Sequence, residues 1–371
     1  MTADQQRRPP ARAARAVPRL LLVLGVTAAL ASCASGHPAA HAPAHPRHAA
    51  AGGAPAVRPP DTGTPGAAAD SDAQQAGGSG SPLAAPARLV PFDGRALGGE
   101  GTWKAAGRPV HGVRAVYETT LVPPGGSRPA GISWMDTRLL SARLYSGSVS
   151  PGGGPYRFTA PIEPAQAASL VAAFNGGFKM KDARGGYYTE GRTIDPLRRG
   201  AASLVIYADG SVNIGAWGSD VVMTRQVVSV RQNLRPLVAG GRPTPQAAGI
   251  HWRSWGSTCG ATSCAASVPG LEHQWRSGAG VTADGALVYV TGPALAPQQL
   301  AQLLVRAGVV RGMQLDINPD WTVFVAYDPL APGDLAAPAD GTKLVASTVQ
   351  GPQTFFEPAW ARDFVTMSAR R

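Results

Sequence analysis

The sequence lacks the motifs that mark many well-known enzyme sites. It contains no Gly-x-Ser-x-Gly nucleophile elbow, no phosphate-binding Gly-x-x-x-x-Gly-Lys loop and no His-Glu-x-x-His zinc motif. It also has no basic helix and no aromatic stacking array, so nucleic acid is not an expected partner. These absences exclude several familiar classes of chemistry, and any active site must be built from other polar segments.

The chain also lacks an apolar run of the length that a permanent membrane helix needs, which is roughly 20 residues. The apolar run Leu20–Leu30 is shorter, follows five arginines, and is followed by Ala31-Ser32-Cys33. Positive charge, a short apolar run and then small residues are typical of a secretory signal. Because Leu30–Cys33 resembles a bacterial lipobox, we expect residues 1–33 to be a lipoprotein signal peptide with Cys33 lipidated. The alternative is an ordinary cleaved signal with a chance cysteine.

Acidic residues are scarce: 23 Asp and Glu stand against 34 Lys and Arg, a net charge of +11. Loss of the five signal-peptide arginines and Asp4 would lower the charge to +7. Such an excess favours a phosphate-bearing partner, for example an anionic glycan or glycolipid. An exported, membrane-anchored protein has no ready supply of ATP or nicotinamide cofactor. Hydrolysis is therefore the favoured reaction, since water is its only co-substrate.

Large apolar residues are nearly absent from residues 34–87, which consist mainly of Ala, Pro, Gly, Ser and His. Such a segment cannot bury enough surface to offset the entropy of ordering it. We expect a disordered tether that joins the lipid anchor to a single domain, residues 88–371. The tether holds four histidines, for which a metal-binding tract is the alternative to compositional drift. They are His37, His41, His45 and His48.

Cysteine is rare, and only Cys259 and Cys264 lie in the expected domain. In an oxidising compartment, two cysteines so close together favour a local disulfide bond. A metal knuckle is the alternative, with His251 and His273 as loosely placed further ligands.

The pattern of the domain predicts mostly strands and two helices. We expect helices over Pro164–Phe174 and Pro297–Ala307, because each begins with proline and ends before glycine. Ala208-Asp209-Gly210 and Ala283-Asp284-Gly285 predict hairpin turns. This order indicates a mixed α/β (α+β) fold, a single domain of mixed, largely antiparallel sheet with a few packed helices. Further strands are expected at Val113–Val122, Gly131–Asp136, Leu139–Tyr145, Ser203–Tyr207, Val212–Ile214, Gly280–Thr282, Leu287–Thr291, Met313–Ile317 and Thr322–Tyr327.

Three segments carry polar residues at positions where the hydrophobic pattern of the sequence predicts a buried core. Asn175, Gly176 and Gly177 follow the first predicted helix; they allow close approach to a ligand, or form a plain glycine cap. Asp316 ends an apolar strand, where a carboxylate is usually paired, bound to metal or tuned for catalysis, unless it bonds a neighbouring turn. Arg276 offers a fork for phosphate, or a surface salt bridge.

Together these segments resemble the phosphodiester glycosidase family, which includes the lysosomal enzyme that uncovers mannose-6-phosphate and many bacterial exported proteins. Two further segments, Ile132–Asp136 and Gln232–Leu237, extend the resemblance, which covers about Val113 to Tyr327. The features that carry it occur in the family's order: Phe174–Phe178, Arg276, Gly280–Gly285, Pro297–Ala307 and Met313–Asp316.

The resemblance implies an exported hydrolase that cleaves a sugar-1-phosphodiester in a cell-envelope glycan or glycolipid. Asp316 would be the catalytic carboxylate or would hold a ligand, and Arg276 would bind phosphate. Asn175, Gly176 and Gly177 would orient the substrate. Since glycoside cleavage normally uses two carboxyl groups, Glu190 is a candidate for the second, with Asp136 and Asp320 as alternatives.

The late motif departs from the family pattern. Relatives usually carry Leu-Asp-Gly-Gly-Gly-Ser, whereas this chain has Ile317-Asn318-Pro319-Asp320 after Asp316. Either Asn318 and Asp320 supply new substrate-binding groups, or hydrolysis has been lost. A non-catalytic surface lipoprotein that binds an anionic glycan is therefore the alternative function, and a scaffold for wall-assembly enzymes is a third. No cofactor is expected with certainty, although the resemblance makes a structural calcium ion plausible.

Overall fold

The computed structural model describes residues 81–92, 94, 98–248, 255 and 272–371. All of them belong to one compact unit, Asp70–Arg371. The predicted signal peptide with Cys33, most of the predicted tether and the predicted Cys259–Cys264 disulfide lie outside the described residues. Leu83, inside the predicted tether, donates its backbone amide to Oδ2 of Asp136 at 2.8 Å and packs against the core. Contacts with the domain therefore begin before residue 88.

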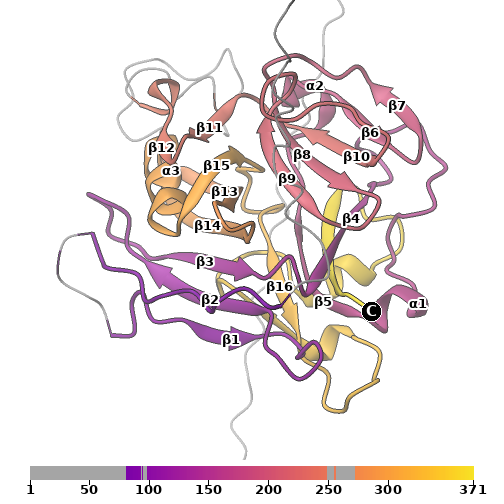
Figure 1. Cartoon of the computed structure of the whole chain (residues 1–371), viewed down its shortest axis with the longest axis horizontal. Helices are drawn as coiled ribbons and strands as arrows, with labels where there is room; N and C mark the ends of the chain where they lie inside the picture. Colours follow the sequence, from indigo (N-terminus) through magenta and orange to yellow (C-terminus); the bar gives the residue numbers. More distant parts are fainter. Residues whose placement is uncertain (1–80, 93, 95–97, 249–254, 256–271) are drawn as a thin grey trace, which may run out of the picture. The chain divides into compact units, whose positions relative to one another are not determined.

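The described part is built from three sheets whose named strands all pair antiparallel, which confirms the predicted mixed, largely antiparallel fold (Figure 1). The largest sheet contains the long hairpin of β13 and β14, joined at the predicted Ala283–Gly285 turn. Its strands, in spatial order, are β1 (Lys104–Ala106), β2 (Val116–Leu121), β3 (Ala130–Met135), β14 (Leu287–Leu295), β13 (Gln274–Thr282), β15 (Val309–Gln314), β11 (Pro236–Ala239) and β12 (Arg242–Pro243).

The other two sheets have five strands each. One contains the predicted hairpin around Ala208–Gly210 and runs in the order β7 (Arg192–Asp195), β6 (Tyr187–Thr189), β10 (Val227–Gln232), β8 (Ala202–Tyr207) and β9 (Val212–Ala216). The other runs in the order β17 (Gly341–Lys343), β16 (Phe324–Tyr327), β5 (Leu170–Asn175), β18 (Phe364–Ala369) and β4 (Leu140–Tyr145).

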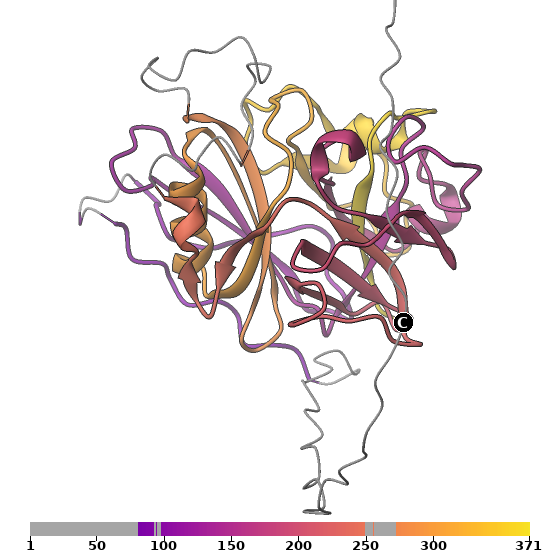
Figure 2. The same ribbon diagram turned by 90° about the horizontal axis from the view of Figure 1, so that it is seen from above.

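The second predicted helix is confirmed as α3 (Pro297–Arg306). Its apolar side chains recur at helical spacing, and Leu300, Leu303 and Leu304 are fully buried. The helix lies against β13, β14 and β15, as both views show (Figures 1 and 2). The described part also contains two short α-helices and three short 3-10 helices. These are α1 (Pro164–Ala167), α2 (Met180–Ala183), η1 (Pro245–Ala247), η3 (Pro338–Asp340) and η4 (Pro352–Phe356).

The prediction of a helix over Pro164–Phe174 is wrong for most of that segment. Only the four residues of α1 are helical, and Leu170–Asn175 form strand β5 instead. This strand lies between β16 and β18 and is buried along its whole length. A strand covered on both faces has no polar alternation, so its apolar run cannot be told from a buried helix by pattern alone. Gly176 and Gly177 therefore follow a strand, and the glycine helix-cap interpretation does not apply.

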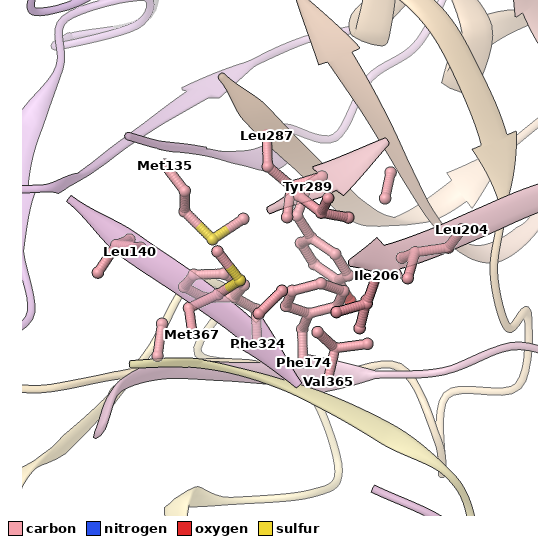
Figure 3. Close-up of a cluster of buried hydrophobic side chains, with 14 of the residues drawn as sticks. Met135, Leu140, Phe174, Leu204, Ile206, Leu287, Tyr289, Phe324, Val365 and Met367 are labelled. Atoms are coloured by element: carbon pink, nitrogen blue, oxygen red, sulfur yellow. The ribbon is translucent and has the colours of Figure 1, made fainter. Parts of the chain in front are cut away.

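The main core forms where the three sheets meet. Phe174, Tyr289 and Phe324 pack against one another with ring centroids 5.2 to 6.2 Å apart. Around them lie side chains from every sheet, among them Leu204 and Met367 (Figure 3). Aromatic packing of this kind fixes how the strands approach one another. It thereby positions the strand ends that carry the polar residues described next.

No helix among the described residues is both long and apolar enough to cross a bilayer.

Candidate functional site

Three chain segments meet beside the exit of β5. The first is the loop after β5, which begins with Gly176 and Gly177. The second is the segment between β15 and β16, which contains Asp316. The third precedes β18 and contains Arg362 and Asp363. They meet because β5 pairs with β16 on one side and with β18 on the other. The backbone amide of Gly176 accordingly donates to the carbonyl oxygen of Asp363 at 2.9 Å.

Asp316 is a buried carboxylate that is held by three donors. Its Oδ1 accepts hydrogen bonds from the backbone amides of Ile317 and Asn318, at 2.8 and 3.0 Å. Its Oδ2 accepts a hydrogen bond from Nη2 of Arg362 at 2.5 Å. Burial raises the pKa of Asp316, and these three donors only partly oppose that shift. A carboxylate has about four acceptor positions, so one remains for a water molecule or a substrate.

Arg362 is the partner of Asp316, yet it uses only part of its guanidinium group. Its Nη2 donates to Oδ2 of Asp316 and to the carbonyl oxygen of Gly177, the latter at 2.7 Å. Its Nε is buried and has no hydrogen-bond partner among the described residues. The guanidinium lies 5.2 Å from the ring centroid of Trp321, which contacts the ring of Trp360 edge to face. Both tryptophans are only partly buried, so an aromatic surface adjoins the ion pair.

A second ion pair, Arg231 with Asp363, lies next to the first. Oδ2 of Asp363 accepts from Nε of Arg231 at 2.7 Å, and both side chains are almost completely buried. Nη1 of Arg231 donates to the carbonyl oxygen of Gln232 at 2.6 Å, and Nη2 donates to the carbonyl oxygen of Phe178. Every nitrogen of this guanidinium therefore has an acceptor, and the pair anchors the loop after β5 to β10 and β18.

The two glycines are needed for this close packing. A Cβ on Gly176 would stand 2.0 Å from Oδ2 of Asp363, and one on Gly177 would stand 2.9 Å from Cγ of Asn233. Only glycine lets the backbone approach both side chains. Asn233 completes the arrangement, since its Oδ1 accepts from the amide of Phe178 at 3.0 Å and its Nδ2 donates to the carbonyl oxygen of Gln314 at 2.9 Å.

Asn175, predicted to orient a substrate, lies beside this site but is buried and engaged internally. Its Oδ1 accepts from the hydroxyl of Tyr289 at 2.6 Å and from the amide of Val323 at 3.1 Å. Its Nδ2 donates to Oγ of Ser277 at 3.0 Å, and that hydroxyl donates to the carbonyl oxygen of Asp316 at 2.9 Å. Asn175 thus supports the backbone of Asp316 through Ser277.

Arg276, predicted to bind phosphate, points away from Asp316. Since Ser277 faces Asn175, its neighbour in β13 faces the opposite side of the sheet. There Arg276 donates to the carbonyl oxygen of Leu295 at 2.7 Å and to Oε1 of Gln314 at 2.8 Å. It is fully buried, and burial lowers its pKa to about 9. Among its described contacts, Arg276 ties strand ends together.

The remaining predicted residues fall into two groups. Asn318 and Asp320 lie on the same loop as Asp316, where Oδ1 of Asn318 accepts from the amide of Asp320 at 2.9 Å. Glu190 lies at the turn between β6 and β7 and lines a separate pocket of about 1030 Å³, with no residue of the Asp316 site in its wall. Asp136 caps the turn after β3 by accepting from the amide of Arg138 at 2.8 Å.

The site does not fit a calcium ion. Calcium takes six to eight oxygen ligands, whereas both oxygens of Asp316 are already bound to hydrogen-bond donors and Oδ1 of Asn318 accepts an amide proton. Nor do the described residues contain a group of three or more His, Cys, Asp or Glu side chains suited to a metal.

Four residues of the site escaped sequence reasoning: Arg231, Trp321, Arg362 and Asp363. A sequence signal existed for three of them. Arg231 interrupts the apolar strand β10, and Arg362-Asp363 directly precede the apolar strand β18. Charged residues in or beside buried strands need partners. Which partners they find depends on tertiary structure alone.

Comparison with known proteins gives only distant likenesses. No family model and no curated protein matches the chain. One similar solved structure is the catalytic domain of zebrafish N-acetylglucosamine-1-phosphodiester alpha-N-acetylglucosaminidase, auto-inhibited by its pro-peptide. It is 16% identical with a TM-score of 0.40, over 72% of this chain and 87% of that one. Another is a hypothetical protein from Synechocystis, 12% identical with a TM-score of 0.36, over 71% and 64% of the two chains. Likeness of this extent assigns the chain to no family and no activity.

Proposed function

We propose that this chain is a hydrolase that cleaves a sugar-1-phosphodiester at the Asp316–Arg362 pair. The observation that carries the proposal is a buried carboxyl group beside an incompletely paired guanidinium, with an aromatic surface next to both. Each part suits one part of such a substrate, and the sequence resemblance to phosphodiester glycosidases points to the same substrate class.

Arg362 would bind the phosphate group. Its Nε is buried with no partner in the described part of the chain, and a buried donor left unpaired is costly unless a ligand satisfies it. A phosphate oxygen is a suitable acceptor for guanidinium donors. Arg362 takes this role in place of Arg276, whose described donors are bound to backbone and Gln314. Trp321 and Trp360 would lie against the apolar face of the sugar ring.

Asp316 would act on the water molecule or on the anomeric carbon. In the balanced reaction, the bond between C1 and the phosphate oxygen breaks, water adds hydroxyl to C1, and its proton passes to Asp316 and then to solvent. The phosphate monoester leaves as an anion and needs little protonation. Burial raises the pKa of Asp316, which makes its carboxylate a stronger base than that of an ordinary aspartate. Asp320, on the same loop, is the proposed second carboxyl group, whereas Glu190 lines another pocket.

The decisive variant is Asp316→Asn in the full-length chain. With a sugar-1-phosphodiester substrate, we expect release of sugar and phosphate monoester to fall about 10²–10⁴-fold, the usual contribution of acid–base catalysis. Asp284→Asn is the matched control, because Asp284 lies at the exposed β13–β14 turn and an asparagine oxygen can still accept from Oγ1 of Thr282. Full turnover by Asp316→Asn would refute the proposal.

Non-catalytic binding of an anionic glycan is the second candidate. One observation favours it: both oxygens of Asp316 already accept hydrogen bonds, and residues other than glycine follow Asp316. Titration of the wild-type chain with phosphate-bearing glycans, combined with product detection, separates the two functions. Binding without product would support the second.

We also propose that the chain is exported and lipid-anchored outside the cytoplasm, on the strength of its N-terminal pattern. Cys33→Ala should then release the protein from the membrane fraction and abolish labelling by a fatty acid. Unchanged membrane association would contradict the anchor.

A further inference from the structure

Apart from the Asp316 site, the domain has a cavity of about 580 Å³ lined by four arginines. The arginines are Arg184, Arg198, Arg199 and Arg235, all with exposed side chains. We propose that this cavity is a second binding site, for an anion that carries two or more phosphate groups.

The first observation is that these guanidinium groups are unused. No hydrogen bond or ion pair joins any of the four guanidinium groups to another of the described residues, and no Asp or Glu is among the described residues that line the cavity. Two other arginines, by contrast, are engaged: Arg114 pairs with Asp328 at 2.7 Å, and Arg192 donates to the carbonyl oxygen of Pro155 at 2.9 Å. Four cations around one hollow repel one another, and a bound polyanion would convert that repulsion into attraction.

The second observation is that the backbone beneath these side chains is firmly held. Arg198 is clamped by buried Gln232, whose Oε1 accepts from the Arg198 amide at 2.8 Å and whose Nε2 donates to its carbonyl oxygen at 3.2 Å. The amide of Leu234, beside Arg235, donates to the carbonyl oxygen of Ala183, beside Arg184, at 2.7 Å. Three of the four arginines are therefore positioned relative to one another by hydrogen bonds that need no ligand.

The third observation concerns size and chemistry. Small-molecule sites typically have about 300–1,000 Å³ and combine apolar walls with a few polar groups. Here Leu234, Pro236 and Trp255 supply apolar surface, and the arginines supply forks that match phosphate oxygens. This combination favours a compact organic or inorganic polyphosphate over a single weakly charged anion.

The cavity is separate from the proposed catalytic site. None of its lining residues belongs to the Asp316–Arg362 or Arg231–Asp363 pair. Binding here does not require that the hydrolase proposal be correct, and failure of one leaves the other intact.

The test uses calorimetric titration of the full-length chain with tripolyphosphate, in a buffer free of divalent metals. Saturable binding is expected, and the double variant Arg199→Glu/Arg235→Glu should raise Kd by at least about tenfold, since each phosphate contact contributes on the order of a charge-assisted hydrogen bond. Arg199→Lys/Arg235→Lys keeps the charge but loses the fork, so it should bind with intermediate affinity.

The matched control is Arg128→Glu/Arg225→Glu, which makes the same charge change at two exposed arginines outside the cavity. It should change Kd by less than about threefold, as expected for screened charges at a distance. Thermal unfolding of each variant shows whether it is folded. An equal loss of binding in the control would overturn the proposal.

Two further arms separate the possible sources of phosphate. Inorganic phosphate should bind more weakly than tripolyphosphate, because it engages fewer arginines. Vesicles containing phosphatidylglycerol test a membrane surface instead. If the vesicles bind through these arginines while tripolyphosphate does not bind, the cavity is part of a basic membrane-facing surface and the proposal is wrong.

Discussion

The two buried ion pairs beside the exit of β5 differ in how completely they are satisfied. Arg231 has an acceptor for every nitrogen, and Asp363 takes two of its donors. Nε of Arg362 has no partner in the part of the chain that the structure describes, and its guanidinium lies against a partly buried tryptophan. Each pair joins an arginine to an aspartate, and the two pairs lie on adjoining segments. We call Arg231–Asp363 the closed pair, because every nitrogen of its guanidinium has an acceptor. We call Arg362–Asp316 the open pair, because one nitrogen of its guanidinium has none among the described residues.

The difference separates a pair with a structural role from the pair that is proposed to be functional. A fully hydrogen-bonded buried pair gives conformational definition and has nothing left for a ligand. A pair with an unpaired donor and a carboxyl of raised pKa retains capacity for binding and proton transfer. We infer that Arg231–Asp363 fixes the loop in place so that Arg362–Asp316 can be held open.

The largest expected effect is the contrast between Arg231→Met and Arg362→Met. Loss of Arg231 leaves Asp363 buried without its cation and should lower the free energy of unfolding by about 3–5 kcal/mol. Loss of Arg362 should cost less, about 1–3 kcal/mol, because Asp316 can take up a proton and keeps two amide donors. Chemical denaturation of both variants measures the difference. Equal losses of unfolding free energy in the two variants would show that the two ion pairs do not differ in this way.

The next effect concerns the glycine that touches the closed pair. In Gly176→Ala the new Cβ would overlap Oδ2 of Asp363, 2.0 Å away, so the loop or the ion pair must shift. We expect a loss of unfolding free energy of about 1–3 kcal/mol or more, the usual cost of overpacking. Gly98→Ala is the control, since its Cβ would meet nothing within 4 Å. A neutral Gly176→Ala would show that the packing is looser than described.

The smallest effect is a change in the pH dependence of stability at the open pair. Burial raises the folded-state pKa of Asp316 above its ordinary value of 3.8, so the folded protein binds this proton more tightly than the unfolded chain. The contribution of Asp316 to stability is therefore fully present below pH 3.8 and declines as pH rises through the folded pKa.

Asp316→Asn should remove that decline. Urea unfolding at a series of pH values upward from about pH 4, near the ordinary pKa of a carboxyl group, would measure it. Asp284→Asn should keep the wild-type pH dependence. If Asp316→Asn also keeps the wild-type pH dependence, then burial does not raise the folded-state pKa of Asp316.

Local patterns predicted several elements of the fold. Leucines at helical spacing placed α3, since an amphipathic helix needs only one apolar face to be recognised. Asp-Gly turns placed the β8–β9 and β13–β14 hairpins, because these dipeptides favour the backbone of tight turns. The same reasoning failed at β5, where the alanine-rich segment Pro164–Phe174 suggested a helix but burial on both faces favours a strand from Leu170.

The site was predictable only in part. Asp316 and Gly176–Gly177 stood out because a carboxylate at the end of an apolar strand needs a partner and because paired glycines allow the backbone to approach a ligand closely. Arg276 also stood out, but the alternation of side chains along β13 turns it away from Asp316. The direction of its side chain depends on the register of β13, which the sequence around Arg276 does not show. Glu190 was a candidate for the second carboxyl group, but it lines another pocket, where its oxygens accept from the amides of Arg157 and Phe158.

The sequence by itself determined the balance of strands and helices, the two hairpins, and the presence of a carboxylate that needs an explanation. Tertiary structure alone decided the partners. Arg231 meets Asp363 across 132 positions of chain, and Arg362 meets Asp316 across 46. Such pairings depend on which strands become neighbours in a sheet. That choice follows from burial summed over the whole core, whereas local periodicity reports only which face of an element is apolar.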